Sequence, residues 1–123
     1  VVMDNEAGME HISRLTTSDV DVLLIVADTS RRGLQAGLRI QQLVKDLNIG
    51  VGKTCLVINQ SKGEPLPAAL RLIDEAGLEL AGTVPADDEV YRLDLEGRPT
   101  IELPEDNPAV TAANRIFDKI LAV

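Results

Sequence analysis

The sequence contains almost no aromatic side chains: tryptophan is absent, and Tyr91 and Phe117 are the only tyrosine and phenylalanine. A hydrophobic core must therefore be built from valine, leucine, isoleucine and alanine, and the 45% hydrophobic content is sufficient for one. Such an aliphatic composition is typical of a parallel sheet that helices bury on both faces. Domains that bind single-stranded nucleic acid stack its bases on aromatic rings, so the composition disfavours that function.

Positive charge is also scarce, since 12 lysine and arginine residues stand against 20 acids and leave a net charge of −8. Nucleic acids and anionic membranes attract basic surfaces and would repel this one. The sequence has no apolar run long enough to span a membrane and no signal-peptide pattern at its start. We therefore expect a cytoplasmic protein that binds neither nucleic acid nor membranes.

Cysteine and histidine each occur once, as Cys55 and His11. A single cysteine cannot form an internal disulfide, and its position inside an apolar run predicts a buried core residue rather than a nucleophile or a metal ligand. His11 has no cysteine or second histidine nearby, so it is a poor candidate for a metal ligand. The sequence therefore offers no cysteine–histidine metal site.

Apolar runs alternate with helical periodicity along the chain. β-Branched and apolar runs predict strands at residues 1–4, Val20–Ala27, 54–59 and 80–84. Apolar residues at helical spacing predict helices at residues 30–47, 67–77, 87–95 and Pro108–Leu121, with a loop and short helix at 8–17 and a loop at 96–107. This order predicts an α/β fold, a doubly wound and mostly parallel sheet flanked by helices, in a single domain of residues 1–123.

One segment, Gly-Val-Gly-Lys-Thr at residues 50–54, is similar to the end of a phosphate-binding P-loop. That pattern requires a glycine five residues before Gly52, where this chain has Leu47. A P-loop also follows a strand and opens a helix, whereas this segment follows a predicted helix and leads into a strand. We therefore interpret the segment as the stop of a helix, in which Gly50 and Gly52 permit the turn and Lys53 lies near the helix-end carbonyls.

Three candidate positions follow predicted strands, at the sheet edge where open α/β sheets bind ligands. Asp4 ends the first strand, where a carboxylate can serve a ligand or cap the following turn. The amide of Asn59 can pair with a base edge through one donor and one acceptor, or it can form an ordinary Asx-turn. The acids of residues 84–90 can line a site or begin the next helix, near the positive end of its dipole. The residues alone leave these alternatives open.

Residues 1–11 read as a short strand that ends at Asp4 and runs into a glycine loop at Gly8. In P-loop nucleoside triphosphatases, an aspartate in this position holds the magnesium ion, and a glycine lets a backbone N–H reach the terminal phosphate. Such enzymes have their phosphate-binding loop earlier in the chain, and here nothing precedes Val1. We therefore expect that the chain lacks the N-terminal P-loop portion.

Four stretches resemble the deviant-Walker ATPases of the CooC type, which mature carbon monoxide dehydrogenase and belong to the wider MinD/ParA-like group. They are Asp-Asn-Glu-Ala-Gly-Met-Glu-His at residues 4–11, Val-Ala-Asp-Thr-Ser-Arg-Arg-Gly-Leu at 26–34, Val-Ile-Asn-Gln at 57–60 and Gly-Thr-Val-Pro-Ala-Asp-Asp-Glu-Val at 82–90. The resemblance covers essentially all of the chain and the C-terminal half of the family's length. It implies the C-terminal half of a P-loop NTPase fold.

The resemblance also implies roles for individual residues. Asp4 would help to hold magnesium and Gly8 would sense the γ-phosphate as a switch, which makes these two the candidate catalytic positions. Asn59 would read the adenine, while Pro85 and Asp87 would line the base and ribose side. ATP and magnesium would be the cofactors, and nucleotide would close two subunits of a homodimer face to face.

The chain departs from the family in two features. It has neither the lysine loop that cradles the phosphates nor the paired Cys-X-Cys that binds metal at the dimer interface. The full-length parent would be an ATP-binding metallocentre-maturation ATPase that couples ATP-dependent dimerisation to nickel insertion, with carbon monoxide dehydrogenase or a related metalloenzyme as partner. The chain alone is expected to be inactive as an ATPase and to hold no nickel.

Two other interpretations remain open. The chain can be a stand-alone, nucleotide-free domain that binds a partner through its acidic helices. It can also be part of a MinD/ParA-like positioning ATPase. The membrane helix of such proteins is basic, however, whereas residues 116–123 contain one lysine and one aspartate.

Overall fold

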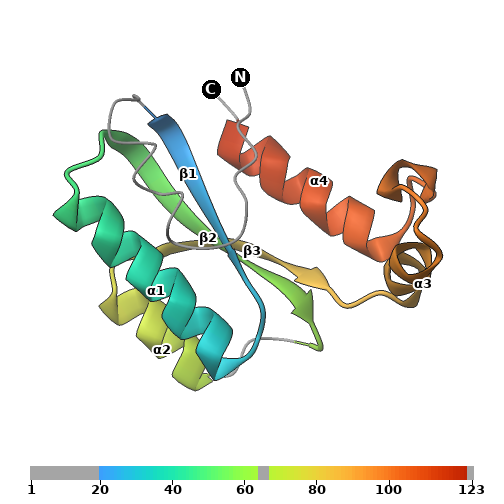
Figure 1. Ribbon diagram of the computed structural model, residues 1–123, viewed down its shortest axis with the longest axis horizontal. Helices are drawn as coiled ribbons and strands as arrows, with labels where there is room; N and C mark the ends of the chain where they lie inside the picture. The colour runs from blue at the N-terminus through green and yellow to red at the C-terminus, as the bar shows by residue number, and fades with distance from the viewer. Residues whose placement is uncertain (1–19, 64–66, 122–123) are drawn as a thin grey trace.

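The computed structural model describes residues 20–63 and 67–121 (Figure 1). Its strands are β1 (Val20–Ala27), β2 (Val51–Ser61) and β3 (Glu79–Pro85), and its α-helices are α1 (Arg31–Asp46), α2 (Pro67–Glu75), α3 (Asp88–Glu96) and α4 (Pro108–Leu121). The short 3₁₀ helix η2 (Thr100–Glu102) lies between α3 and α4. The strand expected at residues 1–4 and the helix expected at 8–17 lie outside the described residues. None of the helices in the two described ranges is long and apolar enough to cross a membrane.

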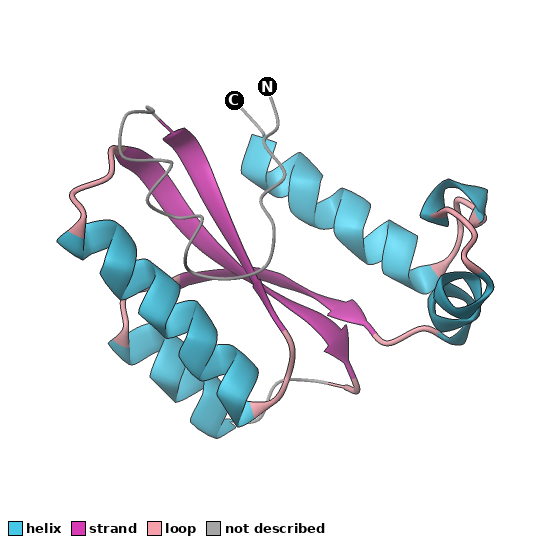
Figure 2. Ribbon diagram, in the orientation of Figure 1, coloured by secondary structure: helices cyan, strands magenta, loops and turns pink. Residues whose placement is uncertain are grey.

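The three described strands form one parallel sheet in the order β1-β2-β3. Helices α1 and α2 cover one face of this sheet, and α4 packs against β3 on the other face (Figure 2). Because α1 and α2 each connect two neighbouring parallel strands, right-handed crossovers place them on the same side. The doubly wound α/β fold predicted from the alternation is therefore confirmed.

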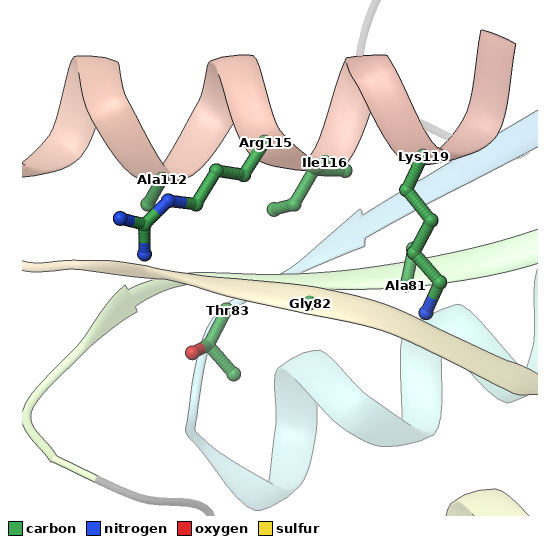
Figure 3. A pocket seen from close by; sticks show the side chains of 7 residues that line it. All are labelled: Ala81, Gly82, Thr83, Ala112, Arg115, Ile116 and Lys119. Atoms are coloured by element: carbon green, nitrogen blue, oxygen red, sulfur yellow. The ribbon is translucent and has the colours of Figure 1, made fainter. Parts of the chain in front are cut away.

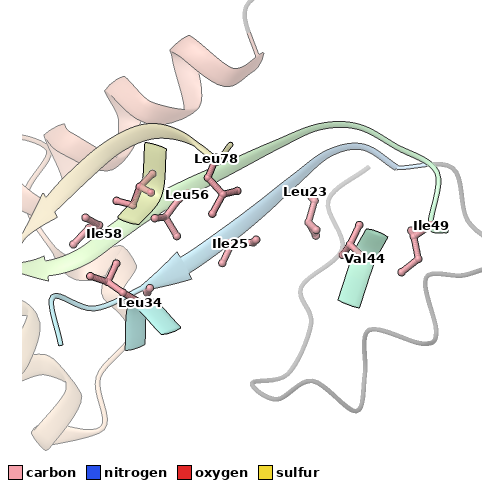
Figure 4. Packing of buried hydrophobic residues seen from close by; sticks show 10 residues of the cluster. Leu23, Ile25, Leu34, Val44, Ile49, Leu56, Ile58 and Leu78 are labelled. Carbon is pink, nitrogen blue, oxygen red and sulfur yellow. The ribbon is translucent and has the colours of Figure 1, made fainter. Parts of the chain in front are cut away.

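The main hydrophobic core lies between the sheet and the pair α1 and α2 (Figure 4). Leu56 and Ile58 of β2 belong to this core and are each 1% exposed. Side chains alternate along a strand, so Cys55 and Val57 point to the opposite face, where they are also buried. β2 is thus the central strand, buried on both faces, and the prediction that Cys55 is a core residue is confirmed.

Strand β3 contains a bulge at Ala81. The pairing of β2 with β3 shifts register between Leu56 and Val57, which leaves Ala81 as one extra residue. The bulge turns Gly82 toward α4, where a Cβ added to Gly82 would lie 2.7 Å from Cγ1 of Ile116. The missing side chain of Gly82 therefore lets α4 approach the sheet closely.

Residues 50–54 do not form the helix stop that the sequence suggested. The C-cap of α1 is Leu47, and Asn48 makes the turn with a left-handed φ of 53°. Asparagine tolerates this conformation better than most residues, so the two glycines are not needed for it. Strand β2 already includes Lys53, whose Nζ lies 3.3 Å from Oε2 of Glu79 rather than near helix-end carbonyls. The prediction that the segment is not a P-loop is confirmed, because it lies in a strand and no helix follows it directly.

Candidate functional site

The carboxyl-terminal ends of β1, β2 and β3 meet at one edge of the sheet, because all three strands are parallel (Figure 1). Asn59 lies near the end of β2, and Pro85 ends β3. The backbone joins these two ends: Ser61 pairs with Pro85, and the N–H of Ala86 donates to the carbonyl of Ser61 at 2.9 Å. The structure thus brings Asn59 and Pro85 to the same edge, as the sequence predicted.

The side chain of Asn59 turns back onto its own backbone. Its Oδ1 accepts a hydrogen bond from the N–H of Gln60 at 2.9 Å. Like the Asx-turn that the sequence left open, this bond joins the side chain to the neighbouring backbone. It uses one lone pair of Oδ1 and leaves the second unused, and no residue of the described part accepts a hydrogen bond from Nδ2. Within the described residues, Asn59 therefore retains one lone pair of Oδ1 and both N–H donors of Nδ2 for a ligand.

Gln60 directly follows and adopts a left-handed φ of 55°. This conformation costs about 1 kcal/mol for a residue that has a side chain. The pairing of β2 with β3 shifts register between Ile58 and Ser61, so Gln60 lies at a break in the ladder. Strained backbone is concentrated at ligand-binding sites, where the surrounding structure holds it in place. Its position beside Asn59 agrees with a binding role for this edge.

Asp87 is the N-cap of α3. One carboxylate oxygen, Oδ1, accepts hydrogen bonds from the backbone N–H groups of Glu89 at 2.9 Å and Val90 at 3.1 Å. It accepts a third from Nδ2 of Asn107 at 3.0 Å. The bond from Asn107, together with the two backbone bonds, holds the pKa of Asp87 below the ordinary value of a carboxyl. The helix-start role that the sequence left open is therefore present, and Oδ1 is committed to it.

Asn107 extends this arrangement to the next helix. Its side chain is buried, at 4% exposure, and its Oδ1 accepts from the N–H groups of Ala109 at 2.9 Å and Val110 at 3.2 Å. One carboxamide thus caps α4 and also holds the cap of α3; we call the pair Asp87 and Asn107 the double cap. The role of Asn107 was not predicted, although asparagine directly before Pro108, the first residue of a helix, is typical of an N-cap.

Asp28 occupies the corresponding position after β1. Its Oδ1 accepts from the backbone N–H of Ser30 at 3.0 Å and from the Ser30 hydroxyl. The Oγ of Ser30 accepts in turn from the N–H of Gly33 at 2.9 Å and so caps α1. The bonds from Ser30 lower the pKa of Asp28. This packing requires a glycine, because a Cβ at Gly33 would lie 2.1 Å from Oδ1 of Asp28. No role was predicted for Asp28, although it lies in the stretch 26–34 that carries the resemblance.

The edge as a whole suits a polar ligand. Helices α1 and α3 both begin here, but their first N–H groups are already capped by Ser30 and Asp87. The amide of Asn59 offers the donor and acceptor that recognise a base edge. The described residues therefore fit the base and ribose side of a nucleotide better than its phosphates, since no lysine loop occurs among them.

Asp4 and Gly8, the predicted magnesium ligand and switch glycine, lie outside the described residues, and their roles stay predictions. Within residues 20–63 and 67–121, no group of three or more His, Cys, Asp or Glu side chains could hold a metal ion. Burial raises the pKa of the Cys55 thiol, which makes this cysteine a poor metal ligand.

Similarity in sequence to curated proteins extends over most of the chain. An uncharacterized ATP-binding protein of Methanocaldococcus jannaschii is 38% identical over 121 residues, which is 98% of this chain and 48% of that protein. A second such protein of the same organism is 34% identical over 122 residues, 98% of this chain and 46% of that protein. The carbon monoxide dehydrogenase accessory protein CooC of Rhodospirillum rubrum is 34% identical over 97 residues, 79% of this chain and 36% of that protein. The chain thus spans about half the length, or less, of the curated relatives that it matches.

Solved structures share the fold at lower identity. The MinD cell division protein of Aquifex aeolicus has a TM-score of 0.66 and 19% identity, and the match covers 84% of this chain and 44% of that one. The cell division ATPase MinD of Pyrococcus furiosus has a TM-score of 0.61 and 18% identity, with 81% and 42% covered. A ParA family ATPase of Chlorobium tepidum has a TM-score of 0.61 and 14% identity, with 81% and 40% covered. At these identities the likeness shows the fold alone.

No protein-family model matches the chain. The relatives in sequence and the neighbours in structure nevertheless agree with each other and with the four stretches that carry the resemblance. By sequence the chain is therefore similar to part of a CooC-type protein and of two ATP-binding proteins, and its fold is that of the MinD and ParA family ATPases.

Proposed function

We propose that the chain is the base-binding, C-terminal portion of an ATP-binding ATPase that matures a metal centre. The observation that carries the proposal is the convergence of Asn59, Pro85 and Asp87 at one sheet edge, in a chain 34% identical to CooC over 79% of its length. Two further relatives are named as ATP-binding proteins. In this proposal Oδ1 of Asn59 accepts from the amino group of adenine, and Nδ2 donates to the neighbouring ring nitrogen.

The other site residues have more limited tasks. Pro85 lines the base, and the oxygen of Asp87 that is not used in the double cap accepts from a ribose hydroxyl. Asp4 holds magnesium, directly or through water, and Gly8 senses the γ-phosphate; both assignments rest on the sequence. The magnesium ion would neutralise phosphate charge when it is bound.

Nickel is proposed as the cargo of the full-length protein, for insertion into carbon monoxide dehydrogenase. The described residues do not themselves fit a nickel site, because Cys55, the chain's single cysteine, is buried in the core. Support for this part of the proposal is the similarity to the carbon monoxide dehydrogenase accessory protein CooC.

The role of Asn59 is tested by binding of a fluorescent ATP analogue to the full-length protein. The Asn59→Asp variant removes the donor and keeps the shape of the side chain. We expect its affinity for ATP to fall about tenfold, since a lost hydrogen bond in a binding site contributes about 1.4 kcal/mol. Asn114→Ala, at an exposed asparagine on α4, is the matched control and should bind like the wild type.

Unchanged affinity in Asn59→Asp would refute the assignment of adenine to this edge. An absence of ATP binding in the wild-type full-length protein would refute the whole proposal and favour a nucleotide-free interaction domain.

The 123-residue chain alone is expected to show no magnesium-dependent ATPase activity, because it contains no lysine loop to bind the phosphates. Phosphate release from the purified chain measures this directly. Robust turnover that is lost in Asp4→Ala would show that the chain is a complete enzyme.

Homodimerisation driven by nucleotide is the second part of the proposal. Among the described strands β1 has only one neighbour, and the apolar side chain of Val26 on it is 58% exposed, which supports association through this side of the described sheet. Sedimentation of the full-length protein should show a dimer with ATP and a monomer with ADP. For the chain alone, the same open edge predicts self-association, and a clean monomer at high concentration would contradict this.

A further inference from the structure

A hollow of about 250 Å³ lies between β3 and α4 (Figure 3). It is lined by three consecutive residues of β3, Ala81, Gly82 and Thr83. The remaining lining residues come from α4. Strand β2 pairs with one edge of β3, and the other edge has no neighbour among the described strands. The hollow thus lies beside α4, on a strand with one edge unpaired in the described part of the chain.

Two cationic side chains of α4 reach this edge. Figure 3 shows Arg115 and Lys119 on either side of Ile116, both extended from α4 toward β3. Neither forms an ion pair with another described residue, whereas the acid at the start of β3, Glu79, is already paired with Lys53 at 3.3 Å. Cations one helical turn apart repel each other, so their pairing on this edge of an acidic protein favours an anionic partner.

The edge of β3 away from β2 has no strand paired with it in the described part of the chain. An edge strand also presents a row of N–H and C=O groups that can pair with an added strand. Two of the residues that line the hollow, Ala81 and Ala112, have small side chains that leave room beside this edge.

We propose that the edge of β3 binds an extended acidic segment of a partner protein as an added strand, with carboxylates at alternate positions against Lys119 and Arg115. The spacing supports this occupant. Residues four apart on a helix are about 6 Å apart along its axis, and residues two apart on a strand are about 6.7 Å apart. Alternate acids on an extended segment therefore match the two cations in succession.

A second copy of the chain is a poorer occupant. Two β3 edges that pair with each other would bring the Arg115 and Lys119 of both copies together, and four cations at one seam repel. A rival explanation is that the bulge and the cations merely protect the edge from aggregation, as in many sheets. The two explanations differ in what happens when the charges are reversed, because glutamates would also protect an edge.

The test uses the full-length protein and a fluorescein-labelled peptide in which glutamate alternates with threonine. Fluorescence anisotropy measures binding to the wild type and to the double variant Arg115→Glu/Lys119→Glu. The matched control is Arg39→Glu/Arg92→Glu, which makes the same change in charge at exposed arginines on α1 and α3.

We expect the reversal at α4 to weaken binding by about tenfold, because two ion pairs are lost and replaced by repulsion, and the control to bind like the wild type. The reversed protein should instead bind the matching peptide with lysine in place of glutamate, which also shows that it is folded. Hydrogen exchange should show protection of the β3 amides when the acidic peptide is bound.

Three results would overturn the proposal. The acidic peptide could bind no better than its glutamine counterpart, which would leave edge protection as the role of the cations. The α4 reversal could bind the acidic peptide as well as the α1 and α3 control. Binding could also occur without protection of β3, which would place the peptide elsewhere.

Discussion

The double cap is the feature whose removal has the most clearly defined consequence. Asn107 accepts from two N–H groups at the start of α4 and donates to Oδ1 of Asp87 at 3.0 Å. Asn107→Ala removes all three bonds. Loss of the cap costs about 1 kcal/mol. Loss of the amide's part-buried bond to Asp87 adds about 1 kcal/mol, the typical net contribution of a hydrogen bond.

The full-length protein carrying Asn107→Ala should therefore be less stable by about 2 kcal/mol. In urea this lowers the midpoint of the transition that includes α3 and α4 by about 1 M. Far-UV circular dichroism follows the transition, and Asn114→Ala on the same helix provides the control. A loss within 0.5 kcal/mol of that control would refute the stabilising role of the double cap, since about that much is usual for surface substitutions.

Asn107→Asp separates the two functions of the side chain. Aspartate still accepts from the N–H groups of Ala109 and Val110, so α4 stays capped. It places a second carboxylate against Asp87 in place of a donor, and the two like charges repel. We expect Asn107→Asp to be less stable than the wild type at pH 7, and the difference to shrink as the pH falls and one carboxyl of the pair becomes protonated.

The stability of the wild type, in contrast, decreases as the pH falls. The folded pKa of Asp87 is lowered from 3.8, so its contribution to stability is fully present above that value and is lost as the pH falls through the folded pKa. Asn107→Ala removes the main cause of the shift and should reduce the loss of stability below pH 3.8. Parallel acid-unfolding curves for the wild type and Asn107→Ala would contradict the assigned cause.

Three further predictions concern other parts of the sheet. Gly82→Ala should lower the free energy of unfolding in urea by about 1–3 kcal/mol, because the new Cβ would lie 2.7 Å from Cγ1 of Ile116 and would overpack the contact with α4. Combining it with Ile116→Ala should recover part of that loss. If the losses of the two substitutions simply add, the two residues are not in direct contact. Cys55, which is 1% exposed and has a raised pKa, should react with thiol reagents only after unfolding, so rapid labelling of the native protein would disprove its burial. Gln60→Gly should raise stability by about 0.5 kcal/mol because it relieves the left-handed φ of 55°, and a decrease would show that the glutamine side chain stabilises the turn.

Two elements were predicted to the residue. Val20–Ala27 is a strand and Pro108–Leu121 is a helix in the structure as in the prediction. Both have strong local signals: the first is a nearly continuous apolar run, and the second begins with proline and has apolar residues at helical spacing. Tertiary contacts agree with these signals and leave the boundaries unchanged.

The boundaries of β2 were predicted less well. The expected strand covered residues 54–59, whereas β2 runs from Val51 to Ser61. Its first residues pair with β1, for example Lys53 with Val22, and Gly52 allows a close approach to the carbonyl of Asp21, which would lie 2.8 Å from an added Cβ. Glycine and lysine have low strand propensity, so only the neighbouring strand makes this segment extended.

By itself the sequence determined the alternation of strands and helices, and hence the edge that brings Asn59 and Pro85 together, because hydrophobic periodicity is a local property and parallel strands end on one side. Only the tertiary structure decided that Asp87 bonds Asn107, 20 residues away, and that Arg115 and Lys119 line the same hollow as Ala81. These contacts depend on how closely α4 docks on β3, which is a matter of packing between distant segments and leaves no periodic signal in the chain.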